Sequence, residues 1–460
     1  MKKQADLEKD AIIPLFFKYY VPSITGLLSV TVNQVIDGLI LGEYVGETGV
    51  AAVGLFGPII TVFIAFLLIL VIGGGIHISK NIGSKNYEVA QSVFLFTTSW
   101  ILLTGVLFYI SAPFAPELLA KWLAGADNEQ LYKHTYDYMF WAFLWIPFFF
   151  IRVLWGSFIN HDNAPKVSRN ASLIAVAFNI VLNILFVIVL DMGVSGASIA
   201  SGIAVLIAVA YLLNYLLKEK GHLKIRAFRF QFYFSEWRTL TFQGFPTFIS
   251  EISFSAGLLL INTSLVPFGE DAVATFGIIS FISFIFLRFF TSAMVSALPI
   301  MSFNIGARQA DRVLATLKFS MLFTFVLGLI IVAIGFLGSS QLISLFSKNS
   351  DPDFMLLATH ALGLFFLFFL AAGPNYLLAA YLQSTGKPKL SILLNSLKGI
   401  ILVWLFLEYS NQIDLGIDGI WLARPFSEVV GLLAIGLLSV LQWNRYFSEK
   451  AILPDEPIEA

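Results

Sequence analysis

The sequence of 460 residues contains no cysteine, and only 12% of its residues are charged. Without thiols the chain has no disulfide, no thiolate metal ligand and no cysteine nucleophile. The histidines do not show the spacing of a metal site; they are His77, His134, His161, His222 and His360. A GxxxxGK[ST] phosphate-binding loop is missing from the sequence as well. We therefore expect that the protein is not an enzyme, has no metal site and binds no cofactor.

An excess of one charge sign is also missing, since 28 basic and 29 acidic residues give a formal net charge of −1. This balance argues against nucleic acid as a partner. What is abundant is apolar surface: 58% of the residues are hydrophobic, 46 are phenylalanine, and the mean hydropathy is +0.84. Soluble domains have roughly 45–50% apolar and 25% charged residues. The lipid bilayer is therefore the expected partner of most of the surface.

Apolar segments of about 20 residues, long enough to span a membrane, recur between short polar joints. No segment shows the alternation of an outer-membrane barrel, and backbone groups in lipid then require helices. The sequence predicts an all-α integral membrane protein. Its twelve expected spans lie at 14–40, 53–77, 91–113, 135–160, 169–190, 194–217, 241–266, 272–301, 314–338, 355–382, 390–409 and 417–442.

Lysine and arginine are distributed unevenly among the joints. If the N-terminus is cytoplasmic, most of the 28 basic residues fall on the cytoplasmic side, while acids such as Glu47, Asp271 and Asp414 fall outside. The positive-inside rule then places both termini in the cytoplasm. The N-terminal segment carries acids and leads into a long apolar segment without a small-residue cleavage site, so it does not resemble a removable signal peptide. We expect a multi-pass protein of the inner (cytoplasmic) membrane.

Short motifs repeat at a single spacing along the chain. The triplet Asn-Ile-Gly occurs at 81–83 and 304–306, the pair Pro-Lys occurs at 165–166 and 388–389, and Gly193 has an equivalent in Gly416. The second copy follows the first at the same interval in every case, and three motifs in one register indicate a duplication. We expect two pseudo-symmetric six-helix bundles, residues 1–217 and 241–460, joined by a cytoplasmic linker at 218–240.

With these motifs the sequence resembles the multidrug and toxic compound extrusion (MATE) transporters over nearly the whole chain. Further matching motifs are Val-Ile-Asp-Gly at 35–38, Gly-Phe-Pro at 244–246 and Gly-Ile-Asp-Gly-Ile-Trp at 416–421. The resemblance implies paired six-helix bundles that export amphipathic, often cationic compounds in exchange for protons or sodium ions. Acidic members of the family often carry Asn and then Asp on the fifth helix, whereas this chain has Asn179 and Asn183. That departure argues against a sodium site.

Asp37 is the first candidate for ion coupling, because ionisable groups inside a span are costly and usually functional. It lies about one turn from the outer end of the first predicted helix, and Asn33 shares its face at i−4. The other candidates are neutral hydrogen-bonding groups that could bind a cation or a substrate: Gln34, Asn179, Asn183 and Ser201. Alternatively, Asp37 meets outside water or headgroups, and the amides only connect helices.

In the second half, Glu251 and Arg288 lie at similar depth in neighbouring predicted helices. We expect that ion or substrate binding at Glu251 releases Arg288; the alternative is a structural salt bridge. Arg424 and Glu428 are spaced i, i+4 and are expected to pair within their helix.

Two further residues of the spans have structural or hinge roles. Lys398 is expected to pair or to extend toward the headgroups. Pro22 removes a hydrogen bond inside the first helix and predicts a hinge, with a static kink as the alternative.

The leading hypothesis is a secondary antiporter, coupled to H⁺ or Na⁺, that exports amphipathic, cationic organic compounds by alternating access. Competition between ion and substrate for Asp37 and Glu251 would couple the two movements. The alternative is a flippase for a lipid-linked saccharide or another amphiphile. We expect the protein to act as a monomer on small organic molecules.

Overall fold

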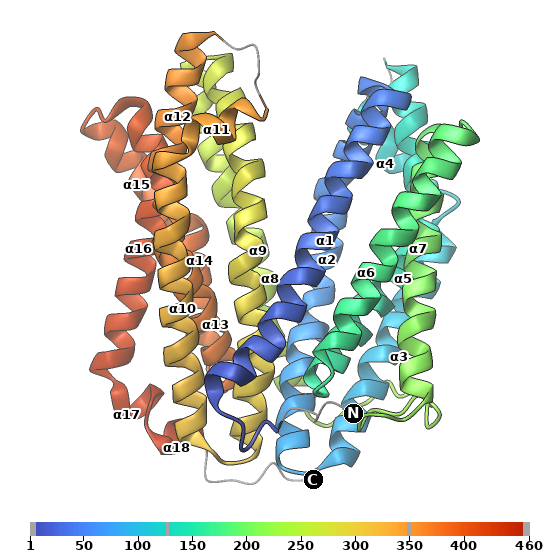
Figure 1. Cartoon of the computed structure of the whole chain (residues 1–460), viewed down its shortest axis with the longest axis vertical. Helices are drawn as coiled ribbons and strands as arrows, with labels where there is room; N and C mark the ends of the chain where they lie inside the picture. Colours follow the sequence, from blue (N-terminus) through green and yellow to red (C-terminus); the bar gives the residue numbers. More distant parts are fainter. Residues whose placement is uncertain (1–5, 126–127, 347–350, 454–460) are drawn as a thin grey trace. The chain divides into compact units, whose positions relative to one another are not determined.

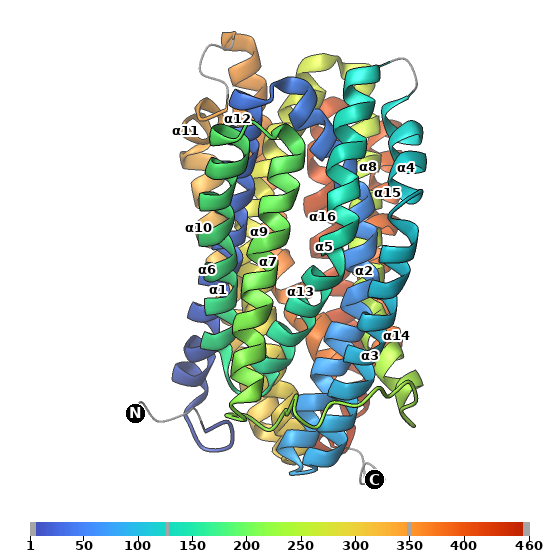
Figure 2. The same ribbon diagram turned by 90° about the vertical axis from the view of Figure 1, so that its right-hand side faces the viewer.

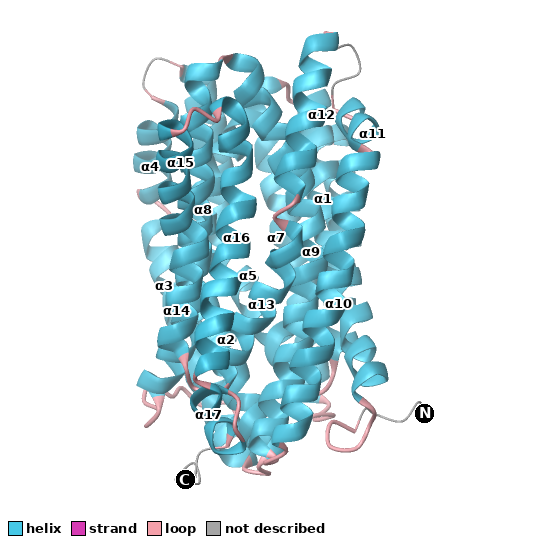
Figure 3. Ribbon diagram, turned by 90° about the vertical axis from the view of Figure 1, so that its left-hand side faces the viewer, coloured by secondary structure: helices cyan, strands magenta, loops and turns pink. Residues whose placement is uncertain are grey.

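The structure, a computed structural model, describes residues 6–125, 128–346 and 351–453. In these residues the chain consists of helices joined by turns and loops, of which the segment at 218–236 is the longest, without a strand (Figure 3). Twelve helices of the described chain are long and apolar enough to cross a membrane. The predicted number of spans and the all-α membrane fold are therefore confirmed. The tenth span is α12 continued by α13, and the eleventh is α14 continued by α15.

The chain divides by its contacts into two compact units. The first contains Val21–Thr241, coloured from blue to green in Figure 1. Its helices are α1 (Ile12–Tyr44, whose first residues belong to the other unit), α2 (Glu47–Gly83), α3 (Tyr87–Ser111), α4 (Ala115–Ala124), α5 (Glu129–His161), α6 (Pro165–Asn183) with the π-helical η1 (Ile184–Val189), and α7 (Gly193–Leu217). In this unit α5 packs against α2, α3 and α7, and Figure 2 shows it between these helices.

The second unit contains Ala5–Tyr20 and Phe242–Ala460. Its helices are α8 (Trp237–Leu265, whose first residues belong to the first unit) with η2 (Val266–Phe268), α9 (Glu270–Gly306), α10 (Ala310–Leu337), α11 (Ser339–Ser344), α12 (Pro352–Phe366), α13 (Phe369–Ser384), α14 (Pro388–Ser396) with the π-helical η3 (Leu397–Ile401), α15 (Leu402–Gln412), α16 (Gly416–Leu441), α17 (Trp443–Tyr446) and α18 (Glu449–Ile452). Here α13 is central and packs against α9, α10 and α16. Its core is rich in buried phenylalanine, which includes Phe290, Phe365 and Phe369.

The backbone repeats between the two units at the same spacing as the sequence motifs. Residues in the left-handed conformation occur in pairs separated by this spacing: Gly46 and Gly269, Lys85 and Arg308, Asn163 and Gly386, Asp191 and Asp414, Gly193 and Gly416. A positive φ is unfavourable for most residues and is found where a helix must end in a tight turn. Both units therefore turn at equivalent points, in agreement with two pseudo-symmetric six-helix bundles.

The N-terminal segment packs with the second unit, which differs from the expected first bundle of residues 1–217. Arg312 Nη2 on α10 donates a hydrogen bond to the carbonyl of Leu7 at 2.8 Å. The ring of Phe16 on α1 lies 5.3 Å from that of Phe319 on α10. These contacts assign residues up to Tyr20 to the second unit, so the division cuts through α1 just before Pro22.

A close helix contact in the second unit depends on two glycines. Gly257 of α8 faces the carbonyl oxygen of Gly399 in η3, and a Cβ at Gly257 would clash with that oxygen. A Cβ at Gly399 would in turn clash with Ser253 of α8. The missing side chains thus allow α8 and η3 to pack backbone to backbone.

We expect Gly257→Ala to destabilise the protein by about 1–3 kcal/mol, because the added methyl group must push α8 and η3 apart. Gly277 on α9 is the matched control, since it is exposed and a Cβ there meets nothing within 4 Å. Gly277→Ala should leave stability unchanged or raise it slightly. Thermal unfolding of both variants in detergent tests this contact; equal midpoints would contradict it.

The segment after α7 is attached to the first unit by Asp162, which follows α5. The side chain of Asp162 is 1% exposed; its Oδ2 accepts from the backbone N of His222 at 2.8 Å, and its Oδ1 lies 2.7 Å from His222 Nδ1. The imidazole stacks on Tyr87, with centroids 4.5 Å apart. Gln91 and Lys224 exchange hydrogen bonds of 2.8 and 2.9 Å. The linker is therefore fixed to the first unit.

This attachment should weaken as the pH rises. The hydrogen bond from His222 to Asp162 raises the pKa of the imidazole above its ordinary value of 6.5. A raised folded-state pKa contributes stability that is complete below pH 6.5 and is lost as the pH rises through the folded pKa. Trypsin should therefore cleave after Lys224, Arg226 and Arg229 faster at pH 8.5 than at pH 6.5, relative to an unstructured reference peptide. His222→Phe keeps an aromatic ring without titration and should remove the dependence; an unchanged pH ratio in that variant would contradict the prediction.

Candidate functional site

The first unit holds a polar network around the carboxylate of Asp37 on α1. Asn33, one turn earlier, donates from Nδ2 to Asp37 Oδ2 at 2.8 Å. Asn183, the last residue of α6, donates from Nδ2 to Asp37 Oδ1 at 2.6 Å and is only 1% exposed. Both carboxylate oxygens are thus bound by amide N–H groups, an arrangement that stabilises a negative charge.

Asn179 and Ser201 extend this network to α7. Asn183 Nδ2 lies 3.1 Å from Asn179 Oδ1, and Asn179 Nδ2 lies 3.0 Å from Ser201 Oγ. The orientation that satisfies both polar atoms of the Asn179 amide has its nitrogen donating to Asp37 Oδ1 at 2.9 Å and its oxygen accepting from Ser201 Oγ at 3.0 Å. In this orientation Asn179 is a further N–H donor to the Asp37 carboxylate.

Five of the six residues predicted for this site come together: Asn33, Asp37, Asn179, Asn183 and Ser201. Gln34 does not join them, because it is exposed and lies beside Asn33 on a different face of α1. The predicted end of the first helix was wrong. Helix α1 continues to Tyr44, so Asp37 lies about two turns from the end of the helix rather than one.

In the second unit, Glu251 and Arg288 lie within electrostatic range of each other, and they are not isolated. Lys398 of η3 is also within electrostatic range of Glu251, and Tyr376 of α13 is within range of both Glu251 and Arg288. The Lys398 ammonium lies 4.9 Å from the centre of the Tyr376 ring. The expected pair is therefore part of a larger group of charges.

Glu428 of α16 is at the centre of the buried half of that group. Its carboxylate accepts from Arg424 Nη2 at 2.6 Å and from Asn375 Nδ2 at 2.6 Å, and Lys398 Nζ lies 3.4 Å away. All three charged side chains are 4% exposed or less. The predicted pairing of Arg424 with Glu428 within one helix is confirmed. The sequence did not show that Lys398 and Asn375 share the same carboxylate.

The MatE family model matches the chain twice, over residues 22–185 and 246–406. The first match lies in the first unit and includes Asp37 with most of the polar residues around it. The second match lies in the second unit and includes Glu251 and Lys398 of the charged cluster. The chain belongs to the MatE family.

Curated relatives of this MatE chain cover almost its whole length. The multidrug export protein MepA of Staphylococcus saprophyticus is 26% identical over 451 residues, which is 97% of each chain. MepA of Staphylococcus haemolyticus is 23% identical over 452 residues and again covers 97% of each chain. Among solved structures, an outward-facing multidrug resistance MATE transporter has a TM-score of 0.88 at 19% identity and covers 97% of this chain and all of its own. That likeness shows the shared fold.

Both clusters of the MatE chain lie beside a π-helical turn, a feature often found at functional sites. The turn η1 begins directly after Asn183, and Lys398 and Gly399 lie within η3. A wide turn disturbs the regular backbone ladder and makes carbonyl groups available. In η3 the carbonyls of Lys398 and Gly399 accept from Arg424 Nη1 at 3.3 and 3.4 Å.

The clusters also share a position in the repeat. Ser201 on α7 and Arg424 on α16 are separated by the same interval as Gly193 and Gly416, so equivalent positions of the two halves of the MatE chain contact the two clusters. The chemistry at these positions differs, since one is a neutral hydroxyl and the other a guanidinium. The first unit therefore has a lone carboxylate among neutral groups, whereas the second has several cations.

The described residues contain no group of three or more His, Asp and Glu side chains that could hold a metal. Around Asp37 the neighbours are amides and a hydroxyl, which suit a proton, a weakly held cation or a polar substrate group. Tyr138 of α5, which the sequence interpretation missed, lies within electrostatic range of Asp37. Tyr138 is far from Asp37 in the sequence, so its place near the carboxylate is known only once the packing of the helices is known.

Proposed function

We propose that the chain is a cation-coupled secondary antiporter that exports amphipathic, cationic organic compounds by alternating access. The observation that carries the proposal is the carboxylate of Asp37, held by Asn33 and Asn183 within helices that are long and apolar enough to cross a membrane. The names of the curated relatives, which are multidrug export proteins, support it.

The proposed coupling follows from competition for one negative charge. A proton or a sodium ion at Asp37 neutralises the carboxylate, and a cationic substrate needs the same carboxylate in its charged form. Binding of one therefore opposes binding of the other, which is the requirement for exchange.

In the second unit, Glu251 and Arg288 are proposed to couple binding to a change of conformation. Neutralisation of Glu251 by an ion or substrate would weaken its attraction for Arg288 and favour another conformation. Pro22 serves as the hinge within α1. Two facts support this role: proline lacks the N–H group of a regular helix, and the division between the contact units falls just before it.

The proposed location is the inner membrane, with both termini in the cytoplasm. This orientation puts the basic linker, with Lys218, Lys220, Lys224, Arg226 and Arg229, on the cytoplasmic side. The proposed protein is a monomer in the lipid bilayer, uses no cofactor other than the coupling ion, catalyses no reaction and binds no nucleic acid.

Dye transport in proteoliposomes tests the proposed function. Ethidium movement is followed by fluorescence while a proton gradient and a sodium gradient are imposed separately on the purified protein. Dye movement driven by one gradient, and abolished when that gradient is collapsed, is the expected result and identifies the ion. Movement that only follows the dye gradient would contradict antiport.

A second candidate function is a flippase for a lipid-linked saccharide or another anionic amphiphile. The three cations of the second unit, Arg288, Lys398 and Arg424, favour this alternative. It predicts that neither ion gradient moves ethidium, and that the same proteoliposomes transfer a fluorescent anionic lipid between leaflets.

A further inference from the structure

The linker after α7 presents a row of aromatic rings on the surface of the first unit. Phe228, Phe230 and Phe232 alternate along the chain, and their ring centroids lie 5.3 and 6.0 Å apart. The ring of Phe232 then lies 5.8 Å from that of Trp100 on α3. Phe230 is 65% exposed, Phe232 48% and Trp100 40%. The linker and α3 thus form one continuous aromatic surface.

This surface lies beside a helix that is long and apolar enough to cross a membrane. Gln91 of α3 exchanges hydrogen bonds with Lys224, and eight residues further along the helix Ser99 Oγ accepts from the backbone N of Gln231 at 2.9 Å. The linker therefore follows α3 for about 12 Å, and Figure 2 shows it on the outside of the first unit. Along this stretch α3 changes from polar to apolar residues, and such a change marks the boundary of a bilayer, where aromatic side chains are favoured.

Two arginines lie at the start of the aromatic row. A turn closed by the hydrogen bond from Phe228 N to Ile225 O, at 2.9 Å, has Arg226 at its tip, and Arg229 follows the turn. Both arginine side chains are exposed, and neither forms an ion pair with another residue of the described chain. Their charges are therefore available to an outside partner.

The acids of the linker do not neutralise these arginines. Glu219 pairs with Lys224 at 3.8 Å, and Glu236 lies 3.5 Å from the ring of His77 on α2. Between the two acids, residues 220–235 contain no Asp or Glu. The exposed charge of this segment is positive, and guanidinium groups bind phosphate through paired hydrogen bonds.

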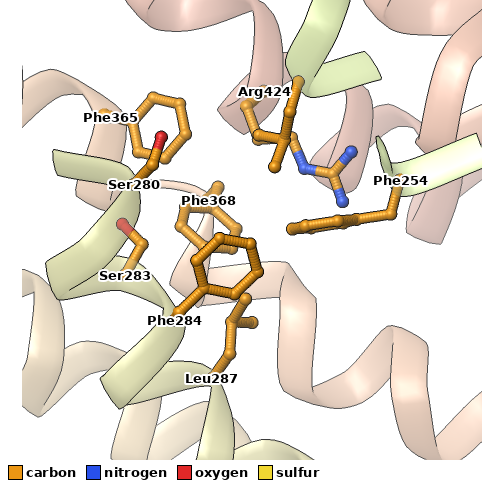
Figure 4. A pocket seen from close by; sticks show the side chains of 9 residues that line it. Phe254, Ser280, Ser283, Phe284, Leu287, Phe365, Phe368 and Arg424 are labelled. Atoms are coloured by element: carbon orange, nitrogen blue, oxygen red, sulfur yellow. The ribbon is translucent and has the colours of Figure 1, made fainter. Parts of the chain in front are cut away.

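An arginine beside aromatic rings in the second unit is arranged differently. Arg424 lies over the Phe254 ring within a group of aromatic side chains (Figure 4). That guanidinium is 1% exposed, and Glu428 accepts its hydrogen bond at 2.6 Å. The second unit thus provides the partner of its arginine from within the fold, whereas the two arginines of the linker face outward.

We propose that Arg226 and Arg229, together with the rings of Phe230, Phe232 and Trp100, bind an anionic phospholipid of the adjoining leaflet. The phosphate accepts hydrogen bonds from the two guanidinium groups, and an acyl chain packs on the rings. A free phosphate would satisfy the arginines but would leave the exposed rings in water, so the combination favours a lipid. The site does not depend on the proposed antiport, because lipid binding is measured without transport.

Native mass spectrometry tests the site, with the full-length protein in a neutral detergent and phosphatidylglycerol as the titrated lipid. Phosphatidylcholine with the same acyl chains has a phosphate but no net charge, and glycerol 3-phosphate has the phosphate without the chains. We expect the tightest phosphatidylglycerol to bind at least about tenfold more strongly than phosphatidylcholine. An excess of glycerol 3-phosphate should not displace it.

The variant Arg226→Gln/Arg229→Gln keeps polar side chains on the linker but removes both charges. It should weaken the tightest phosphatidylglycerol binding at least about tenfold, because each basic residue near an anionic headgroup adds to the attraction. Lys218→Gln/Lys220→Gln is the matched control, since it removes two exposed charges from the same linker away from the aromatic row. This control should bind like the native protein.

Phe230→Ser tests the apolar half of the site. It removes a ring that is 65% exposed and leaves the net charge unchanged, and it should also weaken phosphatidylglycerol binding. All of these side chains lie on the surface, so the thermal midpoints should stay near the native value.

The proposal fails if the folded arginine variant keeps native affinity for phosphatidylglycerol. An equal loss in the lysine control would also overturn it, because attraction to the total charge of the linker would then explain the binding. Equally tight binding of phosphatidylcholine would indicate a merely apolar surface. Displacement by glycerol 3-phosphate, or native affinity in Phe230→Ser, would indicate a phosphate site rather than a lipid site.

Discussion

Asp37→Asn should reduce gradient-driven ethidium transport to the level of liposomes without protein. The substitution preserves the size of the side chain but removes the negative charge for which ion and substrate compete. The fold should persist, because the new amide oxygen can still accept from Asn183 or Asn33 and the other amide can turn to a new partner. Transport is measured in proteoliposomes under the gradient that drives the native protein.

Glu43→Gln is the matched control for this variant. Glu43 is an exposed acid near the end of the same helix, and its loss removes the same charge without affecting the network. This variant should transport at the native rate. Gradient-driven transport that persists in folded Asp37→Asn would exclude Asp37 as the coupling residue and would leave Glu251 as the candidate acid.

The spans could be predicted from the sequence because lipid leaves the backbone few choices. A segment of about 20 apolar residues must form a helix, whatever surrounds it. The ends were less predictable: α2 continues to Gly83 and α1 to Tyr44, beyond the apolar segments. Polar residues outside the bilayer core can continue a helix, so hydropathy predicts where the apolar segment ends but not where the helix ends.

The network of Asp37 was partly predictable. The spacing of Asn33 and Asp37, and of Asn179 and Asn183, places each pair on one helix face. The bond from Asn183 to Asp37 joins residues 146 positions apart, and no local pattern determines such a contact. Only the resemblance to a known family suggested that these two helices meet.

The cluster around Glu428 shows more clearly which contacts could not be predicted from the sequence. Arg424 is four residues from Glu428 and was assigned to it correctly, whereas Lys398 is 30 and Asn375 53 residues away. The π-helical turn that contains Lys398 was not predictable either, because it arises from one extra residue in a hydrogen-bonded turn. These features depend on how α13, η3 and α16 pack.

Glu428→Gln is expected to destabilise the protein strongly. The carboxylate is 1% exposed and is the shared partner of Arg424 and Lys398. Its loss leaves two buried cations without a counter-charge, which costs about 3–5 kcal/mol in comparable cases. The midpoint of thermal unfolding in detergent should fall by on the order of 10 °C. Glu408→Gln removes an exposed acid from α15 and should leave the midpoint near the native value.

A second substitution can show whether the destabilisation of Glu428→Gln arises from the lost charge or from lost packing and hydrogen bonds. In the double variant Glu428→Gln/Lys398→Met, one cation remains and the cluster regains the net charge that it has in the native protein. If the destabilisation is electrostatic, the double variant should unfold at a higher temperature than Glu428→Gln alone, although Lys398→Met removes a further polar contact. A double variant less stable than the single one would show that hydrogen bonding and packing of Glu428, rather than its charge, stabilise this part of the second unit.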